Sequence, residues 1–227
     1  MYRTLGAATV EGYAEVLGPG GSRYQLTEED VLTGARGAWG ESSDPAGAAA
    51  VLWTWTQRHA TPRYRRNYPS LASLIRAHSQ PVNPRWARGG EFCGPGGRYE
   101  GTDHCAEERL ARRERYRTAS YASIPAQVRA VVERWATASL PNPVPGAIDF
   151  AARGIGAQSG DRLVATIGGN LFYSEPDSRS WGPDAVRIAL GTRIASAAPS
   201  RSRALAGVAV LALALAGGYA VYRMAEA

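Results

Sequence analysis

Residues 35 to 47 of this chain read ARGAWGESSDPAG, and an apolar run from Ala48 to Thr56 follows them. The pattern predicts the end of one helix, a tight turn and the start of a second helix. Because this second helix is apolar nearly all round, we expect it at the centre of the core. Asp44 followed by Pro45 marks its start, since aspartate caps a helix N-terminus and proline fits the first helical position. Glu41 therefore lies at the C-terminal end of the first helix.

Glu41 is in an unfavourable position for a negative charge. The helix dipole places partial negative charge at a C-terminus, which disfavours a carboxylate there. If the second helix packs Trp53 and Trp55 nearby, desolvation acts in the same direction and raises the pKa of Glu41. A carboxyl group that stays partly protonated near neutral pH can serve as a general acid. The alternative is that Glu41 is an ordinary solvated residue at a helix end.

The composition is basic in an unusual way. The chain has 227 residues and a formal net charge of +6, and all 26 of its basic residues are arginine. A chain of this length can bury one sizeable core and carry an appendage. The positive charge attracts polyanions, which include nucleic acid, anionic lipid and the acidic polymers of bacterial envelopes, but it does not select among them.

The C-terminal region contains an uncharged run of mainly alanine, leucine, valine and glycine from Ala204 to Tyr222. As a helix, the run would span roughly 28 Å, close to the thickness of the hydrocarbon core of a bilayer. We therefore expect a single transmembrane anchor after the linker-like residues 196–203. A buried core helix is the alternative.

The two cysteines, Cys93 and Cys105, flank a turn-rich loop without apolar periodicity. A disulfide between them would close a loop of about thirteen residues and contribute roughly 3 kcal/mol. A metal site would use both cysteines with Asp103 and His104, but no paired Cys-x-x-Cys or second nearby histidine supports it. We therefore expect a disulfide or two free thiols, with no metal and no cofactor.

The remaining patterns predict a mainly α (α+β) fold. Thr27 can cap the first helix, and a hairpin is expected from two short apolar runs around Gly168-Gly169-Asn170. The other expected helices lie at about 45–59, 69–78, 106–117, 125–139 and 183–194, with a basic loop at 63–68. The expected organisation is an N-terminal segment (1–26), a catalytic domain (27–195), a linker (196–203) and the anchor (204–222).

Three segments together resemble the bacterial and phage cell wall hydrolase family of the spore-cortex-lytic type. The first is Gly40-Glu41 with Asp44-Pro45 and the helix to Arg58; the others are 140–150 (LPNPVPGAIDF) and 167–173 (IGGNLFY). The resemblance implies a goose-type-lysozyme-like helical domain that cleaves the glycan bond between N-acetylmuramic acid and N-acetylglucosamine. It also implies that Glu41 is the catalytic acid.

The chain departs from the family pattern at three positions. The family has a second acidic residue in the turn after its glutamate, and Asp44 corresponds to it with one residue fewer between the two acids. Gln57 stands where the family usually has asparagine. Asp149 stands where histidine is common. A glycosidase generally uses two carboxylates, and Asp149 is the better remote candidate for the second. The resemblance also includes lytic transglycosylases, in which Glu41 alone would protonate the glycosidic oxygen and then accept a proton from the substrate's own C6 hydroxyl.

Sugar-binding sites combine aromatic faces with planar amides, so we expect substrate contacts from Gln80, Asn83, Trp86 and Tyr173, together with Asp149. Each has a structural alternative. The two aromatic residues can belong to the core, and the two amides can satisfy turn backbone.

We therefore expect a membrane-anchored, peptidoglycan-degrading enzyme. The arginines before the apolar run favour a cytoplasmic position of the catalytic domain, where a wall enzyme would meet no substrate. Residues Met1 to Val10 show no secretory signal pattern. A virion protein that opens the wall during phage genome entry, alongside other virion proteins, escapes both difficulties. One alternative is a non-enzymatic, membrane-anchored virion or envelope protein that binds DNA or anionic lipid through its arginines. A second alternative is a lysis protein that perturbs the membrane. If the chain is the expected enzyme, we do not expect it to recognise a specific nucleic acid.

Overall fold

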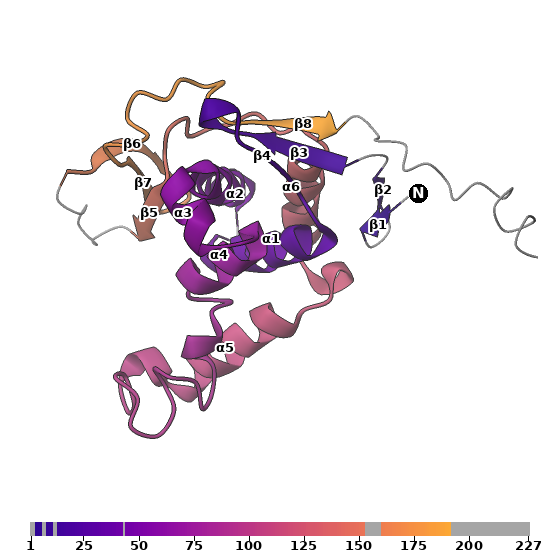
Figure 1. Cartoon of the computed structure of the whole chain (residues 1–227). Helices are drawn as coiled ribbons and strands as arrows, with labels where there is room; N and C mark the ends of the chain where they lie inside the picture. The colour runs from indigo at the N-terminus through magenta and orange to yellow at the C-terminus, as the bar shows by residue number, and fades with distance from the viewer. Residues whose placement is uncertain (1–2, 6–7, 11–12, 43, 153–159, 192–227) are drawn as a thin grey trace, which may run out of the picture. The chain divides into compact units, whose positions relative to one another are not determined.

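The computed structural model describes residues 3–5, 8–10, 13–42, 44–152 and 160–191 (Figure 1). Its described part is a mixed α+β fold. The helices are α1 (Glu28–Glu41), α2 (Pro45–Ala60), α3 (Pro62–Asn67), α4 (Leu71–His78), α5 (Glu107–Thr118) and α6 (Ala126–Ala136). The strands are β1 (Arg3–Leu5), β2 (Ala8–Val10), β3 (Tyr13–Leu17), β4 (Arg23–Gln25), β5 (Asp149–Ala152), β6 (Arg162–Ile167), β7 (Asn170–Ser174) and β8 (Arg187–Gly191).

Helix α2 forms the centre of the core, as the sequence predicts. Every residue from Gly47 to Ala60 is buried, and α1, α4 and α6 contact this helix. The polar groups on α2 find partners inside the core. For example, the indole N–H of Trp135 on α6 donates to Thr56 Oγ1 at 3.1 Å. The apolar character of α2 therefore reflects contacts on all of its sides.

The predicted caps of α1 and α2 are confirmed. Thr27 and Asp30 form a reciprocal capping box at the start of α1, and Asp44 accepts from the Gly47 N–H at the start of α2. Asp30 has a second role, because its other carboxylate oxygen accepts the Ala72 N–H of α4 at 2.7 Å. One buried aspartate thus caps α1 and holds α4 against it.

The predicted hairpin is confirmed and belongs to a three-stranded antiparallel sheet in the order β5-β7-β6. Gly168 and Gly169 form its turn with φ angles of 59° and 80°, a left-handed conformation that glycine adopts readily. Strand β5, which the sequence did not predict, pairs Asp149 with Tyr173 of β7.

The expected helix at 183–194 is wrong over its described part. Arg187 to Gly191 form β8, which pairs antiparallel with β3 near the N-terminal end of the chain (Figure 1). Buried Val186 and Ile188 alternate with exposed Arg187, which is the period of a strand. Strand β3 also pairs with β4, and the sequence predicted neither of these two strands.

The expected basic loop at 63–68 is also wrong, because residues Pro62 to Asn67 form α3. Pro62 occupies the first turn, and the arginines Arg65 and Arg66 fall in the last turn, where the helix dipole favours positive charge.

The described residues all fall within one compact unit, 1–191. The expected linker at 196–203 and the expected anchor from Ala204 to Tyr222 lie outside the described residues. Among the helices that the structure does describe, none has the length and apolar character needed to cross a bilayer.

Candidate active site

Glu41 is the last residue of α1, and its side chain is half-buried. Burial raises the pKa of its carboxyl group from 4.5 to about 7, and a hydrogen bond from Ser79 partly opposes this increase. In that bond, Ser79 Oγ donates to Glu41 Oε1 at 2.8 Å. The predicted elevation of the Glu41 pKa is confirmed, with desolvation as its largest cause. At neutral pH the group can both release and accept a proton.

The glycine before Glu41 allows two backbone segments to come into contact. A Cβ at position 40 would overlap the Cβ of Pro81, lie 2.7 Å from its Cγ and lie 3.2 Å from Cδ2 of Tyr116. No side chain fits there without displacing its neighbours. The contact places the end of α1 against the segment that follows Ser79, and so brings the serine hydroxyl to the carboxyl group.

The turn after Glu41 is ordered by Asp44. This carboxylate accepts hydrogen bonds from Ser42 Oγ and from the Gly47 N–H, both at 2.9 Å. These bonds hold the pKa of Asp44 below its usual value, the Gly47 bond being the largest cause. Asp44 is therefore an anionic helix cap whose oxygens are already engaged.

The β6–β7 hairpin packs directly on this turn. A Cβ at Gly168 would overlap Asp44 Oδ2 and lie 2.9 Å from the Gly47 Cα. Asn170 Nδ2 also donates to the backbone carbonyl of Glu41 at 3.4 Å. Two of the segments that carry the family resemblance, 40–58 and 167–173, are therefore in contact beside Glu41.

Gln57 connects the third segment, 140–150, to α2. Its Nε2 donates to the carbonyls of Val144 and Ala147, at 3.0 and 2.9 Å. Its Oε1 accepts from the Gly146 N–H at 2.8 Å and from Asn142 Nδ2 at 3.2 Å. Both ends of this buried amide are satisfied, so Gln57 fixes the proline-rich segment rather than a ligand.

Asp149 forms an ion pair with Arg58. The carboxylate Oδ1 lies 2.7 Å from Arg58 Nη2, and the two side chains are only 20% and 9% exposed. The guanidinium also lies over the ring of Tyr64, 5.0 Å from its centroid. Removing either partner would leave a poorly solvated charge, so Asp149 is held by this pair and is a poor candidate for activating water.

The other predicted contact residues separate into two groups. Asn83 uses both ends of its amide on backbone, donating to the Ala77 carbonyl and accepting the Arg85 N–H, both at 2.9 Å. Tyr173 is buried in β7. For these two the structure favours the structural alternative. Gln80 lines an open groove, and Trp86 is half-buried in an aromatic cluster that adjoins it.

This groove, which we call the α5 groove, has a volume of about 330 Å³. Its lining residues come from the end of α1, from the segment after α4 and from one face of α5: Gly40, Gln80, Pro81, Glu108, Arg109, Arg112, Arg113 and Tyr116. Gly40 directly precedes Glu41, and Gln80 directly follows Ser79. Glu41 and Ser79 are therefore chain neighbours of two lining residues, although neither side chain is itself part of the groove lining.

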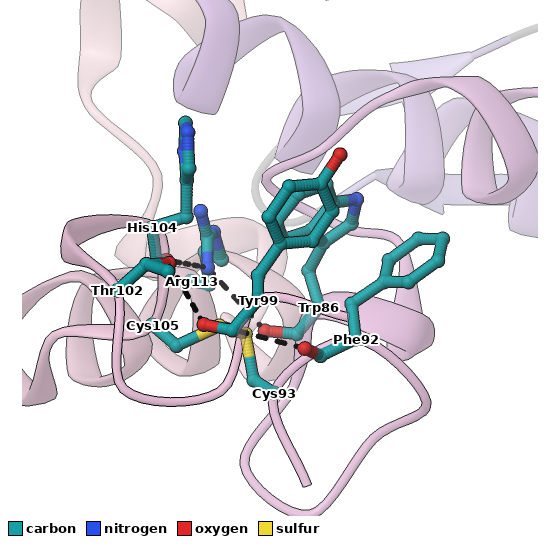
Figure 2. The surroundings of a disulfide bond; sticks show 8 residues. All are labelled: Trp86, Phe92, Cys93, Tyr99, Thr102, His104, Cys105 and Arg113. Carbon is teal, nitrogen blue, oxygen red and sulfur yellow. Dashed lines mark hydrogen bonds between the residues drawn. A yellow bond between two sulfur atoms is a disulfide. The ribbon is translucent and has the colours of Figure 1, made fainter. Parts of the chain in front are cut away.

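The loop beside α5 is closed by a disulfide between Cys93 and Cys105, which removes both thiols as metal ligands. Above the bridge, the rings of Trp86 and Tyr99 stack with centroids 4.8 Å apart (Figure 2). Arg113 lies over the Trp86 ring and donates to the His104 carbonyl at 2.8 Å. The disulfide loop therefore holds one of the arginines that line the groove.

Sequence reasoning missed Ser79, and it expected the helix at 106–117 without assigning the arginines of that helix to the site. A signal was present, since Arg109 and Arg113, like Arg112 and Tyr116, are four residues apart and so share a helix face. What the sequence did not show is that this face meets the end of α1. No protein-family model, no curated protein and no solved structure matches the chain.

Proposed function

We propose that this protein cleaves the glycan strands of peptidoglycan between N-acetylmuramic acid and N-acetylglucosamine, with Glu41 as its acid and base. The observation that carries the proposal is the half-buried Glu41 carboxyl, which has a pKa of about 7, accepts a hydrogen bond from Ser79 and belongs to the residue that directly follows Gly40 of the α5 groove. Glycosidic bonds need such a donor, because the leaving oxygen is a poor leaving group until it is protonated.

The two aspartates that the resemblance offers as a second carboxylate favour a mechanism with a single acid. Asp44 is engaged as a helix cap and Asp149 is paired with Arg58, so neither is free to act as nucleophile or base. In the proposed reaction, Glu41 gives its proton to the glycosidic oxygen as the bond from that oxygen to C1 breaks. The Glu41 carboxylate then accepts the proton of the substrate's C6 hydroxyl, whose oxygen bonds to C1 and closes a 1,6-anhydro ring.

The proposed setting is a membrane-attached enzyme of a virion that opens the wall locally during genome entry. Its support is the uncharged run from Ala204 to Tyr222, flanked by Arg201 and Arg203 on one side and Arg223 on the other.

The test is mass spectrometry of the fragments released from purified peptidoglycan by the detergent-solubilised full chain. We compare the wild type with Glu41→Gln, and with Glu29→Gln as a control because Glu29 is an exposed glutamate at the opposite end of the same helix. The expected result is anhydro-muropeptides from the wild type and the control, and none from Glu41→Gln. Reducing ends would indicate hydrolysis instead, and cleavage by Glu41→Gln at the wild-type rate would refute the role of Glu41.

The rival proposal is a non-enzymatic protein that binds DNA or anionic lipid. It is favoured by one observation, since Arg109, Arg112 and Arg113 have no carboxylate partner among the described residues. Binding of that kind weakens steeply as salt rises, whereas proton transfer from a half-buried carboxyl does not depend on free counterions. Absence of cleavage at any ionic strength, together with salt-sensitive DNA binding, would establish the rival.

A further inference from the structure

The α5 groove carries more positive charge than its own acids neutralise. Three arginines line it, and Glu108 is the one carboxylate among its lining residues. Other arginines close by do pair with acids, for example Arg88 with Glu107 and Arg117 with Glu114. Among the described residues, no carboxylate forms an ion pair with the groove arginines.

One of these arginines is fixed in place. Arg113 is 8% exposed, donates to the His104 carbonyl and lies 5.0 Å from the centroid of the Trp86 ring. Burial lowers its pKa, and the charge of Arg109 lowers it further. A cation that is buried without a counterion beside a second cation is costly, and an anion bound between them would relieve that cost.

The other two arginines are available to a ligand. Arg109 and Arg112 are exposed on α5, and their guanidinium groups form no hydrogen bond to another described residue. A guanidinium binds a carboxylate through two parallel N–H donors, which gives both affinity and orientation. The volume of about 330 Å³ is at the lower end of the range for ligand sites and suits a substituent rather than a whole strand.

The groove is also close to the proposed chemistry. Gly40 and Gln80 line it, and their chain neighbours Glu41 and Ser79 form the carboxyl–hydroxyl pair. Consecutive Cα atoms are about 3.8 Å apart. On the proposed function, a group bound in the groove would therefore belong to a part of the glycan near the cleaved bond.

We propose that the α5 groove is a carboxylate-binding subsite in which Arg109 and Arg112 bind an acidic substituent of the glycan, so that the enzyme selects acidic glycan over neutral N-acetylglucosamine polymers. The inference rests on the proposed function and specifies its substrate class. The carboxylate has two possible sources in peptidoglycan, the lactyl group of a sugar that has lost its peptide and the acidic residues of the peptide stem.

The test measures binding and cleavage separately. Binding is measured by calorimetry with the full chain carrying Glu41→Gln, so that ligands stay intact. The probes are peptide-bearing glycan fragments, glycan strands stripped of peptide by an amidase, neutral chitin oligosaccharides and a DNA duplex. The variant is Arg109→Gln with Arg112→Gln, and its control is Arg134→Gln, an exposed arginine of α6 that does not line the groove.

The expected result is that the double variant binds acidic glycan about tenfold or more weakly, since two charge-assisted hydrogen-bond donors are lost, while chitin binding and the control stay unchanged. If the double variant binds the amidase-treated strands more weakly than the wild type does, the bound group is the lactyl carboxylate. If its binding is weaker only for the peptide-bearing fragments, the bound group is an acidic residue of the peptide stem. Equal effects on acidic and neutral glycan would overturn the proposal, and so would a loss confined to DNA.

The cleavage arm separates the two proposals. If the wild type cleaves peptidoglycan and the double variant does so with the same KM, the subsite is refuted while the proposed function stands. If the wild type cleaves no glycan but still binds acidic fragments through Arg109 and Arg112, the subsite stands and the proposed function fails. Circular dichroism and thermal melting of each variant show that the fold is retained.

Discussion

The Glu41 carboxyl links the stability of the protein to pH. Its pKa is about 7 in the folded chain against an ordinary 4.5, so between these values the folded state binds a proton that the unfolded state has lost. The stabilisation is fully present below about pH 4.5 and is lost as pH rises through 7. The shift corresponds to about 3 kcal/mol of unfolding free energy.

We predict that Glu41→Gln removes this dependence. Glutamine stays uncharged, so the variant should gain stability over the wild type as pH rises, by up to about 3 kcal/mol at pH 8 and little at pH 4.5. Urea denaturation at several pH values measures the difference. Glu29→Gln, at the exposed start of α1, should follow the wild type. A constant difference between Glu41→Gln and the wild type across the pH range would show that Glu41 is not titrating as described.

Residue type alone did not distinguish the roles of the amides. Gln57, Gln80 and Asn83 all belong to the residues that the sequence analysis discussed for the site, yet two of them satisfy backbone groups and one lines the groove. The difference depends on which partners the fold supplies. For Glu41 the local pattern was sufficient, because the end of a helix followed by an apolar helix already implies an unfavourable setting for charge.

At the scale of elements, the contact between the end of α1 and the segment after α4 positions the site. Gly40 makes this contact possible, since a Cβ there would overlap Pro81.

We predict that Gly40→Ala destabilises the protein by about 1–3 kcal/mol through overpacking, even though alanine favours helix by about 1 kcal/mol. We also expect it to slow glycan cleavage, because Ser79 and Glu41 are pushed apart. Thermal melting and a cleavage assay measure the two effects. Gly182→Ala is the matched control, because a Cβ at Gly182 meets nothing within 4 Å. Equal behaviour of the two variants would show that the contact does not position the site.

Local signals predicted the elements that depend on nearby residues, such as the caps of α1 and α2 and the glycine turn of the hairpin. They failed for β8, whose partner strand β3 is far away in sequence. The α5 groove could not be predicted for the same reason. Its charged face is visible in the helix pattern, but its opposite wall comes from a different part of the chain.

At the scale of the whole molecule, the described unit ends at Gly191, and the proposed anchor lies beyond it. A protein can associate with a membrane by inserting an apolar span or by electrostatic attraction of surface arginines. These two modes of association respond differently to lipid charge and salt.

We predict that the full chain floats with vesicles of neutral phosphatidylcholine in high salt, whereas a chain that lacks residues 204–222 does not. Neutral lipid and high salt remove the electrostatic contribution of the arginines, so that apolar insertion remains. Density-gradient flotation measures the association. Flotation of the shortened chain under these conditions would refute the anchor, and flotation of both chains with anionic vesicles in low salt alone would support surface binding by the arginines.

The arginine lining of the α5 groove has a consequence for how the protein would respond to its surroundings. A guanidinium keeps its charge throughout the range in which proteins are handled, whereas an imidazole loses its charge near neutral pH. The groove therefore offers a constant attraction to acidic groups at the pH values where Glu41 gains and loses its proton. The proposed recognition and the proposed proton transfer thus use different kinds of group, so acidification would change the protonation of Glu41 while leaving the attraction of these guanidinium groups unchanged.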